Sequence, residues 1–240
     1  MTDDSLTGRL VTANHVLTDY GVLDGFGHVT VREPGADEML VSRYQSSALV
    51  ETDDIIRMSL DGTVLGSDDA TYSETAIHRA IYRARDDVNA VVHHHAPAVM
   101  PFTVTDAEIE PVFHMGAIFR DGVPTFDDYD HAERGRLVVT EAESDRMAAA
   151  LGDRRAQLLE GHGANVTGAT LEEVVVATVY LVMNARYQLA AMDVADAVGG
   201  EPRYYDGPEE SLDAMVDGVI LRPRTVRRMW DHLVAVHGRE

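Results

Sequence analysis

Apolar residues recur along the chain at the spacings of helices and strands. Between residues 6 and 19 they return every three or four positions, which predicts a helix that ends before Gly21. Shorter apolar runs bounded by turn residues follow, and these are typical of strands. The first half is expected to hold strands over 26–31, 39–42, 55–60, 63–65 and 88–92, and a second helix over 73–86.

The second half repeats this mixture. The pattern predicts strands over 136–139 and 157–159, helices over 143–151 and about 170–197, and a helical tail over 207–240 that is interrupted at Pro223. Thr170 is suited to the N-cap of the long helix, since Glu172 and Glu173 follow where the helix dipole favours acidic side chains. Strands and helices mix without the strict alternation of a doubly wound sheet. We therefore expect one α/β domain over 1–240, with a mixed or antiparallel sheet.

The charge of the chain narrows the choice of partners. Acidic residues number 41 and basic residues 20, which gives a net charge of −21, and every basic residue is an arginine. Such a surface repels a phosphate backbone and an anionic membrane, so we expect neither nucleic acid nor a membrane as partner. Dense carboxylates are consistent with adaptation to a high-salt cytoplasm, although an acidic protein of a low-salt cytoplasm shares this composition.

Two missing residue types exclude further chemistry. The sequence has no cysteine, so disulfides, thiolate nucleophiles and cysteine-built zinc sites are excluded. Without lysine, no Schiff base can form. Residues 1–4 have no hydrophobic signal region behind them, and the longest apolar run, 174–183, is too short to cross a bilayer. We therefore expect a cytoplasmic protein.

Three consecutive histidines follow the strand expected at 88–92. Side chains of a strand alternate between its faces, so His93 and His95 point to one side and His94 to the other. Two imidazoles on one face suit a shared divalent cation. The alternative is a polar strand end with solvated histidines.

His162 and Glu74 extend this group. His162 lies between Gly161 and Gly163, where the backbone can approach a ligand closely, so it would be a third metal ligand or else an ordinary turn histidine. Glu74 lies at the start of the helix expected over 73–86. It would be a ligand or a proton-transfer group beside the cation, or it would only complement the helix dipole.

Taken together, these residues resemble those of the class II aldolase/adducin family. The resemblance rests on Glu74, on the His-x-His pair at 93–95 and on the Gly-His-Gly turn at 161–163. It runs from about residue 6 to residue 192, with supporting stretches at 27–32, 77–92 and 168–173. The combination is specific, whereas each motif alone is weak.

By this resemblance, His93, His95 and His162 bind one catalytic divalent cation per chain. Zinc is expected first, with manganese or iron as alternatives. Glu74 then acts as the base or as a displaceable fourth ligand. The family fold is a single domain of three layers, α/β/α, around a mostly antiparallel sheet. Family members usually form tetramers with active sites between subunits, so a homotetramer is expected.

The resemblance also implies a reaction. A cation that chelates a carbonyl and a neighbouring oxygen stabilises the electrons left when an adjacent carbon–carbon bond breaks. The expected activity is a metal-dependent carbon–carbon lyase that acts on a small hydroxy-carbonyl or hydroxy-carboxylate compound. Family members that bind sugar phosphates have Gly-Asn near the first strand and a glycine-rich loop after the second. This chain has Gly27-His28 and the tripeptide at 42–44 in those places, which disfavours a phosphorylated sugar.

These departures are similar to a side branch of the family that decarboxylates hydroxylated aromatic or pyridine carboxylic acids. By this resemblance Ser42 and Arg43 bind substrate, and Arg43 holds a carboxylate in a bidentate pair. His28 and His114 contact the substrate or supply the proton that replaces carbon dioxide. Aldol cleavage is the alternative lyase reaction. Two further alternatives are an adducin-like binding module without catalysis and an iron-dependent oxygenase on the same scaffold.

Overall fold

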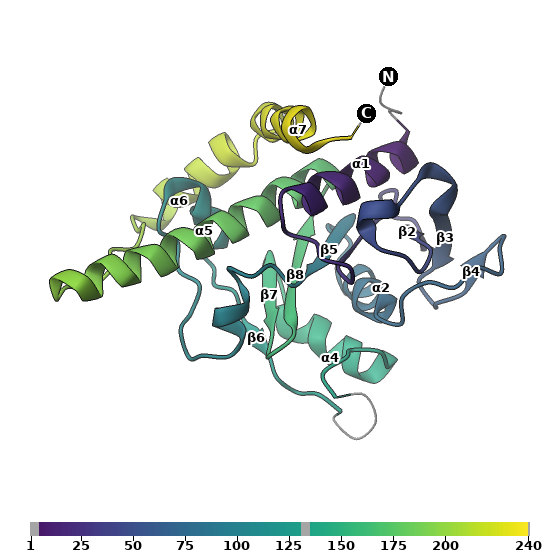
Figure 1. Cartoon of the computed structure of the whole chain (residues 1–240), viewed down its shortest axis with the longest axis horizontal. Coiled ribbons are helices and arrows are strands. Elements are labelled where there is room, and N and C mark those ends of the chain that lie inside the picture. The colour runs from purple at the N-terminus through teal and green to yellow at the C-terminus, as the bar shows by residue number, and fades with distance from the viewer. Residues whose placement is uncertain (1–4, 131–134, 240) are drawn as a thin grey trace.

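An eight-stranded sheet forms the centre of the computed structural model, which describes residues 5–130 and 135–239 (Figure 1). The strand order is β4-β3-β2-β1-β5-β8-β7-β6. The strands are β1 (His28–Val31), β2 (Glu38–Ser42), β3 (Ile55–Ser59), β4 (Val64–Leu65), β5 (Ala90–His94), β6 (Thr125–Phe126), β7 (Ala156–Leu159) and β8 (Gly163–Gly168). Strand β5 therefore lies in the interior of the sheet, between β1 and β8.

The sheet is mixed. In the described residues every neighbouring pair is antiparallel except β6 and β7, which run parallel at one edge. The α/β class is thereby confirmed, with a sheet that is not antiparallel throughout. His28 of β1 lies opposite His93 of β5, and His93 in turn lies opposite Asn165 of β8. Directly opposed side chains lie on the same face of a sheet, so this register places the three polar side chains next to one another on one face.

Helices cover both faces of the sheet (Figure 1). The helices are α1 (Leu6–Asp19), α2 (Thr75–Ala84), α4 (Glu141–Leu151), α5 (Leu171–Val198), α6 (Glu209–Met215) and α7 (Pro223–His237). Helices α2 and α4 pack with Val91 in one core, whereas α1, α5 and α7 pack with Ala90 and Val92 in the other. Successive residues of β5 thus serve opposite cores, which explains why this strand is a continuous apolar run.

Helix α5 carries the longest apolar surface of the chain. It spans 28 residues, and Thr170 caps it by accepting a hydrogen bond from the Glu173 backbone N–H at 3.1 Å, as predicted. By length and composition it could cross a membrane, yet 67% of its most apolar window is buried inside the protein. That burial, in the core with α1 and β8, is the arrangement of a core helix.

The strand predicted over 136–139 is wrong. The edge position beside β7 is occupied by β6 instead, a two-residue strand that is too short to carry a periodic pattern. Val138 is buried in the core beneath α4, and its backbone N–H donates to Oε1 of Glu74 at 3.3 Å. The apolar run at 137–139 therefore serves packing and a side-chain contact rather than strand pairing.

Helix boundaries differ slightly from the predictions. The helix expected over 73–86 is two residues shorter at each end, because the backbone at Arg85 is already extended. The helix expected over 143–151 begins two residues earlier, since the Thr140 side chain caps it by accepting from the Glu143 N–H. The two helical stretches expected in the tail are α6, which continues into a π turn, and α7.

Candidate metal centre

Two imidazoles converge at the carboxyl end of β5. The Nε2 atoms of His93 and His95 lie 3.0 Å apart, whereas His94 is buried and places its Nδ1 where it accepts from the Ala96 backbone N–H at 3.2 Å. The far nitrogens of both rings are hydrogen-bonded. Nδ1 of His93 lies 2.8 Å from Oδ1 of Asn165, and Nδ1 of His95 lies 3.1 Å from Oδ2 of Asp24. These contacts place a proton on each Nδ1 and leave each Nε2 lone pair free.

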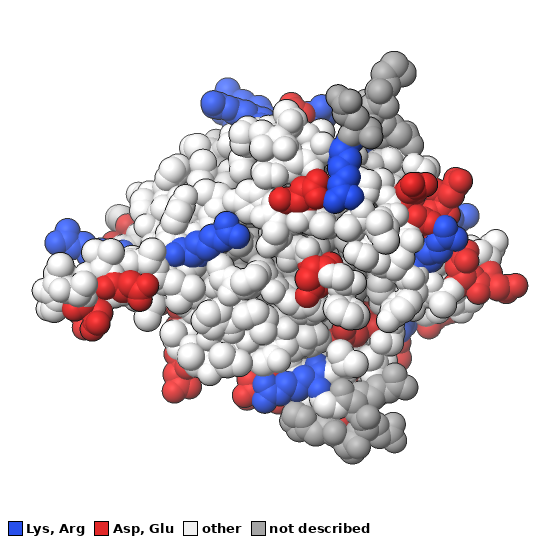
Figure 2. Space-filling model, in the orientation of Figure 1, with Lys and Arg blue, Asp and Glu red and all other residues white. Residues whose placement is uncertain are grey.

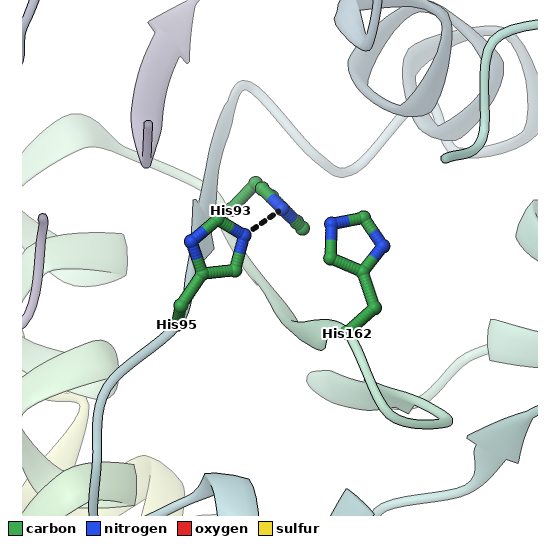
Figure 3. A group of neighbouring side chains, drawn as sticks. All are labelled: His93, His95 and His162. Carbon is green, nitrogen blue, oxygen red and sulfur yellow. Dashed lines mark hydrogen bonds between the residues drawn. The ribbon is translucent and has the colours of Figure 1, made fainter. Parts of the chain in front are cut away.

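His162 completes the group from the turn between β7 and β8. Gly161 adopts φ +60°, a left-handed conformation that favours glycine, and this turn carries the His162 ring toward the other two. Figure 3 shows one nitrogen of His162 facing the rings of His93 and His95. The ring centroid of His162 lies 4.9 Å from that of His93 and 5.3 Å from that of His95.

These three residues fit a divalent cation. Each offers one ligand atom, and the three atoms lie within 4.8 Å of one another. Burial holds the pKa of His93 well below its usual range and lowers that of His162 to about 4, so both imidazoles are neutral, as ligands must be. Three imidazoles are a donor set that zinc and iron accept, with coordination positions left for substrate.

Glu74 lies beside this group, at the N-cap position that precedes α2. Its Oε1 is 3.6 Å from Nε2 of His162, and it also accepts the Val138 backbone N–H. Burial raises the pKa of Glu74 to about 7, and the nearby Glu143 adds to this rise. A carboxyl group with a pKa near neutrality, next to a candidate metal site, is suited to both accepting and donating a proton.

His28 belongs to the same neighbourhood. Its ring stacks on His93, with centroids 5.0 Å apart, and on Tyr72 at 4.8 Å. Together with Glu74 and His93 it forms a second set of possible ligand atoms within 4.8 Å. Ser42 reaches the edge of this stack, because its hydroxyl lies 2.5 Å from the Tyr72 hydroxyl, which itself donates to the Gln45 carbonyl.

Arg43 and His114 are not brought to the three imidazoles. Arg43 pairs with the buried carboxylate of Asp54, although its own side chain remains 46% exposed. His114 is exposed, and its ring packs edge-on against Phe113. Within the described residues neither side chain bonds to the histidine group. Their substrate-binding roles stay predictions.

The sequence interpretation missed the residues that orient the candidate ligands. Asn165 and Asp24 carry no motif, and their contacts with His93 and His95 follow from tertiary structure. Asn165 stands out only in the structure, where it is a polar residue in a strand that is buried throughout. Only the pairing of β5 with β8 shows that it lies opposite His93.

Comparison with known proteins gives the relatives of this chain. Decarboxylase tropJ from Talaromyces stipitatus is 28% identical over 92% of this chain and 89% of its own length. A 3,4-dihydroxyphthalate decarboxylase from Arthrobacter keyseri is 32% identical over 69% of this chain and 70% of its own. Among solved structures, an L-fuculose 1-phosphate aldolase from Glaciozyma antarctica superposes with a TM-score of 0.74 at 23% identity, covering 98% of this chain and 92% of that one.

A family model covers most of the chain, including every residue of the candidate site. The model described as class II aldolase and adducin N-terminal domain matches residues 8–189. This interval contains Glu74, the paired histidines of β5 and the turn that carries His162. The chain therefore belongs to the class II aldolase and adducin N-terminal domain family.

Proposed function

We propose that this chain is a divalent-metal-dependent carbon–carbon lyase, and within that class a decarboxylase of a hydroxylated aromatic or pyridine carboxylic acid. The observation that carries the proposal is the convergence of three imidazoles beside the buried carboxyl group of Glu74. Such a set can hold a cation, keep positions open for substrate oxygens and supply a group for proton transfer.

Two features favour decarboxylation over aldol cleavage. Decarboxylase tropJ, which matches 92% of this chain in sequence, and the 32% identical relative from Arthrobacter keyseri are both decarboxylases. In addition, the segment after β2 provides no glycine-rich loop for a phosphate. The Ser42 hydroxyl is hydrogen-bonded to the Tyr72 hydroxyl, and the Arg43 guanidinium forms a salt bridge with Asp54. A carboxylate substrate needs fewer anion contacts than a phosphorylated sugar.

The histidines and Glu74 have separate roles in the proposed reaction. His93, His95 and His162 would hold the cation through ring nitrogens, and zinc is proposed first, with manganese or iron as alternatives. When bound, the cation supplies Lewis-acid stabilisation of the negative charge that develops as the carbon–carbon bond breaks. Glu74 takes a proton from a substrate hydroxyl and returns a proton to the carbon that has lost carbon dioxide. A neighbouring positive charge favours the ionised form of Glu74 that can accept this proton.

The test is release of carbon dioxide from a panel of hydroxylated benzene and pyridine carboxylic acids by the metal-loaded protein. The wild type should turn over one member, and Glu74→Gln should lower kcat by about 10²- to 10⁴-fold while metal content is kept. Glu173→Gln is the matched control, since the Glu173 side chain is about as shielded from solvent as that of Glu74 but pairs with Arg155 at the start of α5.

Other results would select the alternatives. Aldehyde release from a hydroxy-carbonyl compound would make the chain an aldolase. Oxygen consumption by the iron-loaded protein alone would make it an oxygenase. A chain that binds no divalent metal and turns over no substrate would be an adducin-like binding module.

We also propose the substrate size, the compartment and the oligomeric state that go with this activity. The substrate is proposed to be a small molecule, and the chain is proposed to be one domain over 1–240 that works in the cytoplasm. The working unit is proposed to be a homotetramer, which sedimentation equilibrium of the metal-loaded protein would check.

A further inference from the structure

A buried chain of hydrogen bonds runs from the candidate metal centre into the protein. Nδ1 of His28 lies 2.6 Å from Nε2 of His78, and Nδ1 of His78 lies 2.8 Å from the Thr30 hydroxyl. That hydroxyl lies 2.8 Å from the hydroxyl of Tyr82. All four side chains are at most 2% exposed, so solvent does not complete their hydrogen bonds.

The donors in this series of hydrogen bonds can all point toward His28 or all point toward Tyr82. A neutral imidazole has one N–H and one lone pair, so the direction decides which nitrogen of His28 is protonated. In one direction Tyr82 donates to Thr30, Thr30 to His78, and His78 to His28. In the other direction His28 donates first, and the proton of Tyr82 must find an acceptor elsewhere.

The Tyr82 end selects the first direction. Burial raises the pKa of Tyr82, so the phenol keeps its proton. In the described part of the chain, Thr30 Oγ1 is the only side-chain oxygen that the phenol contacts within hydrogen-bond distance. If the phenol did not donate to Thr30, its buried O–H would have no acceptor, which is strongly disfavoured. Once Thr30 accepts from the phenol, the remaining partner for the O–H of Thr30 in the described residues is Nδ1 of His78, so Thr30 donates to His78.

At the other end of this series of hydrogen bonds, the His28 ring lies beside the candidate metal centre. His28 Nε2 is buried and has no hydrogen-bond partner in the protein. The ring that carries it stacks on His93, and His28 also lies within reach of Glu74. A buried, unpartnered polar atom in this place is completed by a bound ligand or by an ordered water that a ligand displaces.

We propose that Tyr82, acting through Thr30 and His78, holds His28 in the tautomer that carries its proton on Nε2, so that His28 donates a hydrogen bond to a carboxylate or hydroxyl oxygen of the substrate. The substrate class is taken from the proposed function; the tautomer is argued from the hydrogen bonds alone. His28 is then a substrate-binding donor and not a metal ligand. This decides between the two possible ligand sets in favour of His93, His95 and His162.

The tautomer is measured directly by long-range ¹H–¹⁵N NMR of the zinc-loaded protein with ¹⁵N-labelled histidine. We expect a protonated Nε2 and an unprotonated Nδ1 for His28, whose signals His28→Gln identifies by their loss. Tyr82→Phe should populate the other tautomer, whereas Thr30→Ser, which keeps the hydroxyl, should retain the wild-type signals. Tyr180→Phe is the control, because Tyr180 is also a buried tyrosine but lies on α5.

Binding of 3,4-dihydroxybenzoate to the zinc-loaded protein, followed by calorimetry, tests the consequence. Tyr82→Phe and His28→Phe should each weaken binding roughly ten- to a hundredfold, as loss of a hydrogen bond to a charged group does, with zinc content unchanged. A protonated Nδ1 in the wild type, or loss of zinc in His28→Phe, would overturn the proposal. If the protein released no carbon dioxide from any acid, the proposed function would fail while the tautomer measurement still decided this inference.

Discussion

The imidazoles of His93 and His95 are each oriented by a hydrogen bond to the Nδ1 atom of the ring. The amide of Asn165 serves His93, and the carboxylate of Asp24 serves His95. A carboxylate in this position fixes the ring and raises the basicity of the nitrogen that faces the metal. The two rings are therefore held in place, which would reduce the entropy lost if they bind a cation as proposed.

His95→Ala should abolish the metal centre. The variant removes one of three imidazoles, and we expect zinc affinity to fall by more than about a hundredfold, since loss of an orienting partner alone costs about 10- to 100-fold. Metal content per chain, measured on protein purified in high salt, should drop from one ion to none. His114→Ala, which removes an exposed histidine, should keep the ion. Equal metal content in both variants would contradict the assignment.

At the scale of elements, the contact between β5 and the start of β8 sets the distance between the ligands. Gly163 begins β8, and a Cβ atom there would lie 2.5 Å from the His94 carbonyl oxygen and 2.7 Å from the His95 ring. Only glycine permits this approach, because the obstruction includes rigid backbone. The turn and the strand end therefore hold His162 and His95 in one site.

Gly163→Ala should disturb the site and the sheet together. We expect unfolding free energy to fall by about 1–3 kcal/mol, as for overpacked cores, and zinc affinity to fall with it. Thermal unfolding and zinc titration measure the two effects. Gly218→Ala is the control, since a Cβ atom there meets nothing within 4 Å. A variant with wild-type stability and zinc affinity would show that the strands can separate at no cost.

The buried His94 makes stability depend on pH. Burial lowers the pKa of His94 to about 3, from 6.5 in an unfolded chain. Below pH 6.5 the unfolded chain therefore binds a proton that the folded chain does not, so unfolding free energy falls as pH falls by up to about 1.4 kcal/mol per pH unit from this residue. Above pH 6.5 the effect is absent.

His94→Asn should remove this part of the pH dependence. The asparagine oxygen can replace Nδ1 as acceptor for the Ala96 N–H, but it does not titrate. Urea unfolding of metal-free protein between pH 4 and pH 6.5 should give a shallower slope for the variant than for the wild type. Metal-free protein is used so that release of a cation does not add to the slope. Equal slopes would show that His94 is protonated in the fold.

The whole molecule carries a large negative charge. The net charge is −21, and Figure 2 shows acidic side chains over the visible face, most densely at the end that carries β3 and β4. Arginine pairs such as Arg57 with Glu38 and Arg146 with Asp128 offset part of this charge locally. The excess carboxylates repel one another in the folded state more than in the expanded one.

Salt should therefore stabilise the protein. The screening length falls from about 30 Å at 0.01 M to about 3 Å at 1 M salt, so the unfolding midpoint should rise with potassium chloride over this range. An uncharged osmolyte at equal osmolality should not reproduce the early part of the rise. A midpoint that is flat or falls with salt would favour an acidic protein of low-salt surroundings over one adapted to high salt.

The sequence by itself determined the class of the fold and most of its elements. The helix at Leu6–Asp19 and the helix from Leu171 follow from spacing and capping, which are local properties of the chain. The same holds for the alternation that sends His93 and His95 to one side of β5. The Gly-His-Gly turn was also recognisable in the sequence. Glycine is the residue that fits both a left-handed backbone conformation and a close approach of another segment to the backbone.

Only the tertiary structure decided which distant residues meet. Pairing of β5 with β8 placed Asn165 on His93, and folding of the 137–139 segment against α2 gave Glu74 a buried partner at Val138. The hydrogen bond between His28 of β1 and His78 of α2 likewise joins residues that are far apart in the sequence. Such contacts depend on strand register and on packing between layers, and these arise from the whole hydrophobic pattern rather than from any local segment.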